Sequence, residues 1–452
     1  MHAMRTSGPV PPSHQAVTPR PAGPAQGLPQ APHLGAPRST PRALTRGPYE
    51  GEAGAAAGRS RAVRARAAGR GGALRSFAVT EGTNLRIFYK DTGASGEVVL
   101  HGSVNAAAQW MDFPGERVRS SGGRWVRFEV PCNIAMDGEM TVDFAVRARG
   151  EWDNNGGRNF SCQASPGATV AVRDGECVVQ EKGPVLVVSD IDGTMIGDDA
   201  ATRRFVEWWT DVAVPRGSQL VYSSGRHLEL FEELLAEKKG VMVEPDAYIG
   251  SVGTRVYAWG RSPETGAHQL APDSVWETML DADWDWDVMR DGADRAILEY
   301  AGDGEEKLVS WRPKEELSRH KLTLNVSTRV LEGVLRTIEG EAARAGVAGE
   351  LIASGSGDWR YLDIVPKSAG KLKSLQYVQR KLGFRDEATL ACGDSGNDIL
   401  MLSGTNLGVM VGNSQEQLVE WAREKGNGER LFHAEGKVAD GILEGIRHFG
   451  LA

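Results

Sequence analysis

The stretch that decides the fold of the larger part of the chain is PVLVVSDIDGTMI, residues 184–196. Its continuous apolar run is typical of a central parallel strand that is buried on both faces. Such a strand delivers Asp190 and Asp192 to its carboxyl end, where open α/β sheets bind their ligands. Two carboxylates two residues apart point to the same side of a strand, which is unfavourable unless a cation or a proton occupies the site. The segment therefore predicts an α/β sheet with a ligand site at the end of this strand.

Three further polar motifs follow apolar strands or open helices downstream. In SQLVYSSGRHLELFEELLAEKK, the hydroxyl of Ser224 and the main-chain N–H groups after it predict an anion site at a helix start. Lys371 lies in PKSAGKLKSLQYVQRKL, and Asp394 and Asp398 lie in TLACGDSGNDILML. Each motif alone is weak evidence for a catalytic site. The alternative is that these residues form structural turns with solvated carboxylates. Their order, and their positions after strands or at helix starts, favour a catalytic site.

Together these segments resemble the four motifs of the haloacid dehalogenase-like phosphatases. Stretches such as YLDIVPKSAGKLKSLQYV and FHAEGKVADGILEGIRHFGL narrow the resemblance to the sucrose-phosphate phosphatases. The resemblance covers residues 184–452 and implies a Rossmann-like α/β core with an inserted α+β cap over about residues 261–364. It also implies Mg²⁺-dependent hydrolysis of sucrose 6-phosphate, or of a close sugar phosphate, through an aspartyl-phosphate. Because the cap closes over the sugar in that family, we expect substrate choice to lie there.

The resemblance also implies a role for each motif residue. Asp190 would be the nucleophile and Asp192 the general acid/base. Ser224 and Lys371 would bind the phosphoryl oxygens. Magnesium is a hard cation that prefers oxygen ligands, and the residues implied to hold it are Asp190, Asp192 through its carbonyl, Asp394 and Asp398. The residues implied to contact the sugar are Gly225, Arg226, His227, Lys321 and Asn397. For Lys321, an ordinary place in a cap strand is the alternative.

Residues 81–175 carry short alternating runs, among them LRIFYK, RWVRFEV, MTVDFAVRA and ATVAVR, separated by Gly, Ser, Asn and Asp clusters. This pattern predicts an antiparallel β-sandwich, followed by a linker over residues 176–183. Trp125 lies within a strand pattern, as a core tryptophan does. Trp110 and Trp152 lie instead in the polar stretches AAAQWMDFPG and EWDNNGGRNF, which favour exposure. Exposed indole faces can stack on the apolar faces of sugar rings.

The stretches IFYK, LHG with the following QW, and EWDNNGGRNF resemble the starch-binding modules of carbohydrate-binding families 25 and 53. The resemblance implies starch or another α-glucan as a partner. The residues that we assign to glucan binding are His101, Trp110, Trp152, Asn154 and Asn155. For the first three, ordinary packing within the module is the alternative.

Three of the four cysteines, Cys132, Cys162 and Cys177, lie in or beside this predicted module. A disulfide among them is conceivable. In a reducing interior, however, three buried thiols are the favoured interpretation.

The N-terminal residues differ sharply in composition from the rest. Residues 1–75 hold eleven arginines, no lysine and two acids, and eleven of the 21 prolines fall within residues 1–48. We expect this segment to be disordered, and its Arg-rich, acid-poor composition favours a transit peptide over residues 1–76. The chloroplast stroma is preferred to the mitochondrion because a starch-binding module follows. The alternative is a low-complexity segment that carries no targeting signal.

Charge and hydropathy exclude two classes of partner. The first 75 residues carry a formal charge of +9 in a chain of net charge -8, so the remainder is acidic at -17. An acidic body argues against general nucleic-acid binding, and no apolar run approaches the roughly 18 residues of a membrane helix. The leading hypothesis is a magnesium-dependent sugar-phosphate phosphatase held on starch. The alternatives are a plastid phosphatase acting on phosphoglucan or other sugar phosphates, and a starch-binding regulator with an inactive phosphatase domain.

Overall fold

The computed structural model describes residues 84–452, with gaps at 92, 94–95, 133–137, 263, 283, 302–306, 356 and 427. The transit peptide predicted over residues 1–76 lies outside the described residues. The described residues all belong to one compact unit. Among the described residues, no helix has both the length and the apolar character that crossing a membrane requires.

The described residues up to Val179 form what we call the β part. Its strands are β1 (Leu85–Lys90), β2 (Val98–Val104), β3 (Met111–Arg117), β4 (Trp125–Val130), β5 (Met140–Ala148), β6 (Glu151–Asp153), β7 (Phe160–Ala164), β8 (Thr169–Arg173) and β9 (Glu176–Val179). They pair in the order β6-β5-β2-β3-β4-β1-β8-β9, and β7 pairs with β5. Alternation along the strands buries one set of side chains, such as Leu100, Phe128 and Phe144, in a common core.

Strands lie where the runs LRIFYK, RWVRFEV, MTVDFAVRA and ATVAVR predicted them, but two details of the prediction were wrong. First, β1 pairs with β8 in parallel, so the arrangement is not wholly antiparallel. Second, β9 occupies the first half of the predicted linker 176–183, because it pairs antiparallel with β8. The connection that follows β9 is correspondingly shorter.

The cysteines of the β part also differ from expectation. Cys162 in β7 and Cys177 in β9 form a disulfide. Cys132 and Cys392 are free thiols. The favoured interpretation of three reduced thiols was therefore wrong for two of them. The disulfide fastens the edge strand β9 to the strand that follows the EWDNNGG segment.

The α/β part is built on a sheet with the order β14-β13-β12-β11-β10-β19-β20-β21. Its strands are β10 (Leu186–Ser189), β11 (Gln219–Ser223), β12 (Ala247–Gly250), β13 (Arg255–Arg261), β14 (His268–Pro272), β19 (Thr389–Gly393), β20 (Leu407–Met410) and β21 (Leu431–His433). Neighbours from β12 to β21 are parallel, and β13 and β14 add an antiparallel hairpin. As the sequence predicted, β10 is a central parallel strand.

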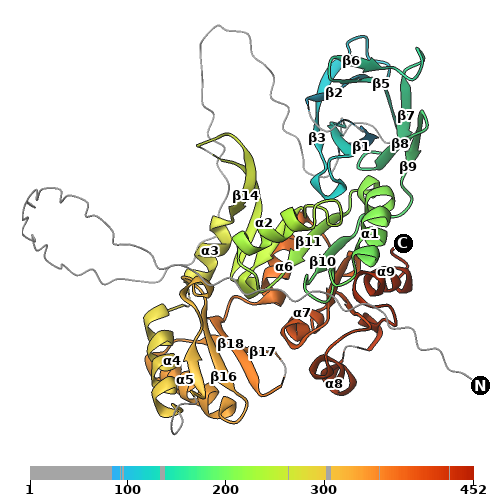
Figure 1. Cartoon of the computed structure of the whole chain (residues 1–452). Coiled ribbons are helices and arrows are strands. Elements are labelled where there is room, and N and C mark those ends of the chain that lie inside the picture. Colours follow the sequence, from blue (N-terminus) through green and yellow to red (C-terminus); the bar gives the residue numbers. More distant parts are fainter. Residues whose placement is uncertain are drawn as a thin grey trace, which may run out of the picture. The chain divides into compact units, whose positions relative to one another are not determined.

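Helices cover both faces of this sheet. One face carries α1 (Asp199–Trp208), α2 (Leu228–Glu237) and α9 (Val438–His448), and the other carries α3 (Ser274–Asp281), α6 (Lys371–Leu382), α7 (Ile399–Leu402) and α8 (Glu416–Lys425) (Figure 1). Along β10, Val187 packs into the first helical layer and Leu186 and Val188 into the second. All three are fully buried, which is why this strand reads as an unbroken apolar run.

A separate antiparallel sheet, β15-β16-β18-β17, forms the cap with two helices. Its elements are α4 (Trp286–Glu299), β15 (Val309–Trp311), β16 (Leu322–Ser327), α5 (Leu331–Ala345), β17 (Gly349–Ser354) and β18 (Trp359–Pro366). Figure 1 shows α4 and α5 side by side along this sheet. The cap begins later than the predicted residue 261, because β14 extends the core sheet and Trp276 of α3 packs beneath that sheet.

The β part packs directly against the α/β part. The indole N–H of Trp125 donates to the carbonyl of Thr210 at 2.8 Å in a buried position. Phe88 and Trp125 share a hydrophobic cluster with Phe205 and Trp209. Trp125 is thus a core residue, as its place in a strand pattern predicted, and it belongs to the core that joins the two parts.

Candidate active site

Asp190 lies directly after β10, where the sequence predicted a ligand site. Its main-chain N–H donates to the carbonyl of Cys392 in β19 at 2.9 Å, so its backbone is held at the point where the strands end. The residue is only 6% exposed. Because β10 and β19 are neighbours in the sheet, the turn after β19 brings Asp394 to the same edge.

The turn after Asp192 depends on a glycine. Gly193 has a φ of +81°, and a Cβ at this position would lie 2.6 Å from Asp394 Oδ2. The Gly193 carbonyl accepts a hydrogen bond from Asn413 Nδ2 at 2.7 Å. Thr194 Oγ1 then donates to Asp394 Oδ1 at 3.0 Å. The first and last motifs are therefore in close contact at Gly193 and Thr194.

Lys371, the first residue of α6, has a fully buried side chain that joins the motifs. Its ammonium donates to Asp190 Oδ1 and to Asp398 Oδ1, each at 2.6 Å. It also donates to Asn397 Oδ1 at 3.0 Å. An ammonium has three donors, so its hydrogen-bonding capacity is used entirely on the motif residues.

The turn after β19 holds Asp398 in a single orientation. Its Oδ2 accepts hydrogen bonds from the main-chain N–H groups of Asp394, at 3.1 Å, and Ser395, at 3.0 Å. This is the capping box of the short helix η7 (Gly396–Asp398). Its other oxygen, Oδ1, is thereby turned toward Lys371.

The cluster holds more negative than positive charge. Asp190, Asp394 and Asp398 can each bring an oxygen within 4.8 Å of the others. Burial, opposed by the charge of Lys371, raises the pKa of Asp190 well above its usual range. Burial and then the charge of Asp398 raise the pKa of Asp394 to about 6. Three buried carboxylates beside one ammonium are a donor set that fits a hard divalent cation such as Mg²⁺.

Asp192 lies outside this buried cluster and has a partner of its own. Arg226 Nε and one terminal nitrogen each donate to a carboxylate oxygen of Asp192 at 2.8 Å, in a bidentate pair. Arg226 follows Ser224 and Gly225 after β11, and its main-chain N–H donates to Ser224 Oγ at 3.2 Å. Ser224 is buried. The structure therefore joins the second motif to the first through a pair that the sequence analysis did not predict.

A strained turn beside the second motif was also missed. In the short helix η4 (Ser251–Gly253), Val252 has a φ of 59°, which is rare for a β-branched residue. Its main-chain N–H donates to the carbonyl of Ser224 at 3.1 Å. A Cβ at Gly253 would lie 2.4 Å from the carbonyl carbon of Gly370, directly before α6. Such strain is often found at functional sites, but only the two glycines of GSVG hint at it in the sequence.

The remaining predicted sugar contacts are only partly brought together. Asn397 lies in the cluster through Lys371. His227 Nδ1 lies 2.8 Å from Glu229 Oε2 at the start of α2. Lys321 is buried within the cap, with Nζ 3.2 Å from Asp363 Oδ1, and no described contact joins it to the motif residues.

In the β part, three residues predicted to bind glucan lie together. The ring of His101 in β2 is 5.4 Å from that of Trp110 and 5.7 Å from that of Trp152 in β6, between ring centroids. Trp152 is 50% exposed, unlike the fully buried tryptophans of the cores. His101 Nδ1 lies 2.6 Å from Asp112 Oδ1, which fixes the imidazole. We call His101, Trp110 and Trp152 the aromatic platform.

The two asparagines predicted to bind glucan make hydrogen bonds that hold their own loop. Asn154 Oδ1 accepts from the Gly157 N–H at 2.9 Å. Asn155 Nδ2 donates to the carbonyls of Asn159, at 3.2 Å, and Gly175, at 3.0 Å. Both amides therefore shape the WDNNGG loop, and Asn155 ties it to the β8–β9 turn.

Comparisons with known proteins concern the α/β part. A family model described as sucrose-6F-phosphate phosphohydrolase matches residues 183–450. The probable sucrose-phosphatase 1 of Arabidopsis thaliana is 33% identical over 278 residues, which cover 59% of this chain and 60% of that protein. The chain thus spans about 60% of the length of the plant sucrose-phosphatases that it matches.

Two bacterial proteins are matched over nearly their whole length. The mannosylfructose-phosphate phosphatase of Agrobacterium fabrum (strain C58) is 30% identical over 268 residues, which cover 59% of this chain and 97% of that protein. The solved structure of the sucrose-phosphatase from Synechocystis sp. PCC6803 in complex with sucrose and phosphate is 28% identical, with a TM-score of 0.49. That match covers 59% of this chain and 98% of the Synechocystis chain.

Proposed function

Because the chain belongs to the sucrose-6F-phosphate phosphohydrolase family, we propose that residues 184–452 are a magnesium-dependent phosphatase of sucrose 6-phosphate or a close sugar phosphate. The observation that carries the proposal is the convergence of Asp190, Lys371, Asp394 and Asp398 at the carboxyl end of the sheet. The matches to plant sucrose-phosphatases and to a mannosylfructose-phosphate phosphatase both support a sugar phosphate as substrate.

Asp190 is the nucleophile in this proposal. Its carboxylate attacks phosphorus, the bond from phosphorus to the sugar oxygen breaks, and an acyl phosphate forms on Asp190. Lys371, 2.6 Å away, favours the ionised carboxylate that attack requires, against the burial that raises its pKa. Attack by water on the acyl phosphate then releases phosphate and restores Asp190.

Asp192 is the general acid in the first step and the general base in the second. It protonates the departing sugar oxygen and then takes a proton from the attacking water. The bidentate pair with Arg226 supports this role, because it holds the carboxylate in a defined orientation beside the nucleophile. Ser224 and Lys371 are the groups that we assign to the phosphoryl oxygens.

We assign Asp190, the main-chain carbonyl of Asp192, Asp394 and Asp398 to hold Mg²⁺. When bound, the ion supplies positive charge to the phosphoryl oxygens. Substrate selection falls to the cap, and β17 of the cap contacts η7, the short helix that contains Asn397. Arg226, His227, Lys321 and Asn397 remain our candidates for contacts with the sugar.

The phosphatase is tested by phosphate release from sucrose 6-phosphate with and without Mg²⁺. Asp190→Asn should lower kcat by at least about a thousandfold, because it removes the nucleophile. Asp287→Asn is the matched control, since this exposed aspartate lies in the first turn of α4 in the cap. A panel with other sugar phosphates and phosphorylated starch distinguishes the phosphoglucan alternative. No turnover on any of them would favour the starch-binding regulator instead.

For the β part, we propose that it holds the enzyme on starch or another α-glucan through the aromatic platform. The support is the grouping of His101, Trp110 and Trp152, with Trp152 half exposed. Trp152→Ala should markedly weaken co-sedimentation with starch, whereas Tyr361→Ala, which replaces an exposed aromatic residue of the cap, should leave it unchanged. Equal sedimentation of both variants would contradict the platform.

We also propose that the protein is delivered to the chloroplast stroma, on the composition of residues 1–75 and the resemblance of the following segment to starch-binding modules. A fusion of residues 1–80 to a fluorescent protein should accumulate in plastids of plant or algal cells. Accumulation in mitochondria or in the cytosol would contradict this assignment.

A further inference from the structure

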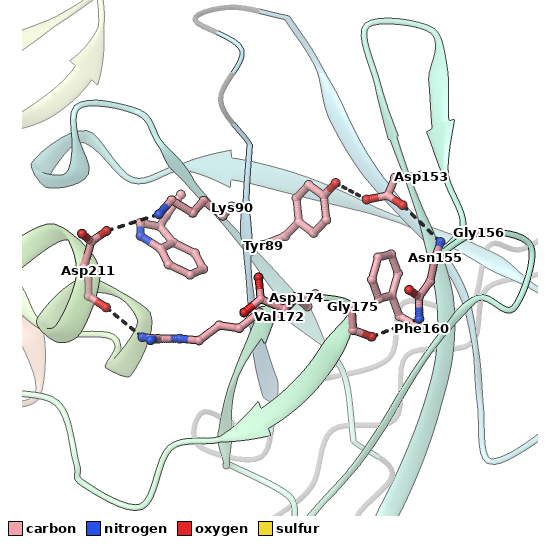
Figure 2. Close-up of a pocket in the computed structure, with 12 residues that line it drawn as sticks. Tyr89, Lys90, Asp153, Asn155, Gly156, Phe160, Val172, Asp174, Gly175 and Asp211 are labelled. Carbon is pink, nitrogen blue, oxygen red and sulfur yellow. Dashed lines mark hydrogen bonds and ion pairs between the residues drawn. The ribbon is translucent and has the colours of Figure 1, made fainter.

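A cavity in the β part is separate from the aromatic platform. It has a volume of about 740 Å³ and opens between β1, β8 and the WDNNGG loop. We call it the β1–β8 pocket, and the lining residues that matter below are Tyr89, Lys90, Asp153, Arg173, Asp174 and Asp211 (Figure 2). Its volume falls within the range of about 300–1,000 Å³ that small-molecule sites occupy.

Its aromatic side is contributed by residues of β1 and β7. Figure 2 shows the ring of Tyr89 in the middle of the lining residues, with its hydroxyl directed at Asp153. That hydroxyl donates to Asp153 Oδ2 at 2.5 Å, which fixes the ring. Phe160 lies beside it, with ring centroids 6.1 Å apart at an angle of 74°. A half-buried, immobilised phenol is the kind of apolar face on which a sugar ring stacks.

The polar side is nearly balanced in charge. Three carboxylates, those of Asp153, Asp174 and Asp211, face two cations, Lys90 and Arg173. This excess of negative charge disfavours a phosphate or another anion as ligand. A neutral polyhydroxylated ligand can donate to the carboxylates and accept from the two cations.

Part of this hydrogen-bonding capacity is not used within the protein. Among the described residues, Asp174 makes no side-chain hydrogen bond, and it is exposed at a φ of 51° in the β8–β9 turn. Lys90 Nζ has one long contact, 3.4 Å to Asp211 Oδ1. Arg173 donates from one terminal nitrogen to the carbonyl of Asp211 at 2.8 Å, which leaves its other donors available.

The same loop serves the pocket and the aromatic platform. Trp152 belongs to the platform, whereas its neighbours Asp153 and Asn155 line the pocket. Asn155 fastens the loop to the Gly175 carbonyl in the β8–β9 turn, directly after Asp174. A ligand in the pocket would therefore contact the segment that positions Trp152.

We propose that the β1–β8 pocket is a second carbohydrate site, which takes a short neutral α-glucan segment independently of the aromatic platform. The choice of glucan, rather than another sugar, rests on the proposed function of the β part. Because Asp211 lies in η2 (Trp209–Ala213), the helical segment that continues α1, a glucan bound here contacts both the β part and the phosphatase. Two sites that share the WDNNGG loop would also strengthen attachment to a polymer by avidity.

The test is calorimetric titration of the full chain with maltotriose. The wild type should show two binding sites, and Trp152→Ala should retain one of them. In the Trp152→Ala background, Lys90→Ala with Asp174→Asn should weaken the remaining affinity about tenfold or more, because charged hydrogen bonds are lost. The matched control pair is Lys307→Ala with Glu176→Gln, which makes the same charge changes at exposed positions outside the pocket.

Hydrogen exchange locates the second site, and unchanged thermal denaturation shows that each variant folds. Maltotriose should protect Tyr89–Lys90 and the β8–β9 turn even in Trp152→Ala. If this variant binds no maltotriose, or if the pocket pair leaves the remaining affinity unchanged, the pocket proposal is wrong while the platform stands. If Trp152→Ala keeps both sites and the pocket pair removes one, the platform assignment fails instead. No binding to the wild type would overturn both.

Discussion

Replacing Lys371 by methionine should destabilise the phosphatase as well as inactivate it. The substitution keeps the length of the side chain and removes a buried charge that lies 2.6 Å from Asp190 Oδ1 and from Asp398 Oδ1. At an effective dielectric of 20, each of these contacts corresponds to about 6 kcal/mol of Coulomb attraction. Much of this offsets the desolvation of the ions, and breaking such a buried pair typically costs about 3–5 kcal/mol. For a part of this size we expect the melting temperature to fall by about 10 °C.

The dependence on pH separates this explanation from simple loss of packing. Burial already raises the pKa of Asp190, and without Lys371 the folded state should hold its proton more tightly still. A carboxyl with a raised folded-state pKa costs stability above that pKa, and the cost shrinks as pH falls toward the ordinary value of about 4. The loss of folding stability caused by Lys371→Met should therefore be largest near pH 8 and smaller near pH 5.

The assay is urea denaturation across this pH range in the presence of a chelator, so that no divalent ion compensates for the missing charge. Lys373→Met is the matched control, because Lys373 is an exposed residue of the same helix. The reasoning is refuted if the free energy of unfolding of Lys371→Met lies within about 1 kcal/mol of the wild-type value at pH 8. It is also refuted if the difference between the two proteins grows as the pH is lowered.

Three further substitutions test single features of the structure. Gly193→Ala should lower kcat about tenfold or more, since its Cβ would meet Asp394; unchanged kinetics would contradict the close packing of the two turns. Burial raises the pKa of the half-buried Asp246 carboxyl to about 6. Asp246→Asn should therefore raise the free energy of unfolding by about 1–2 kcal/mol at pH 8 and hardly at pH 4. Equal effects at both pH values would show that this raised pKa is not the reason. Cys162→Ser with Cys177→Ser should destabilise the β part by about 3 kcal/mol, since the disulfide closes a 15-residue separation, and calorimetry without reductant should show the loss.

Where sequence reasoning succeeded, a local pattern coincided with a physical constraint. The unbroken apolar run before Asp190 predicted a strand buried on both faces, and β10 is such a strand. The polar surroundings of Trp152 predicted exposure, and the side chain is half exposed. Lys371 could not be placed from its own surroundings. Only the resemblance to a family put it beside Asp190, 181 positions earlier in the chain.

The errors concern features that depend on distant partners. Neither strand sequence reveals that β1 lies parallel to β8, and the pairing of β9 decides the end of the β part. The bidentate pair of Arg226 with Asp192 joins two turns that only the sheet brings together. The sequence also did not predict that Asn155 donates to the Gly175 carbonyl, 20 residues away. Such contacts follow from the tertiary arrangement and have no local signature.

The transient phosphorylation of Asp190 is most directly tested by acid quenching during turnover of sucrose 6-phosphate with Mg²⁺, followed by mass spectrometry of the proteolytic peptides. The mechanism predicts one phosphate on the peptide that contains PVLVVSDIDGTMI, lost on treatment with hydroxylamine and absent from Asp190→Asn. Rapid hydrolysis of the substrate with no phosphate on this peptide at any time of quenching, or full activity of Asp190→Asn, would contradict it.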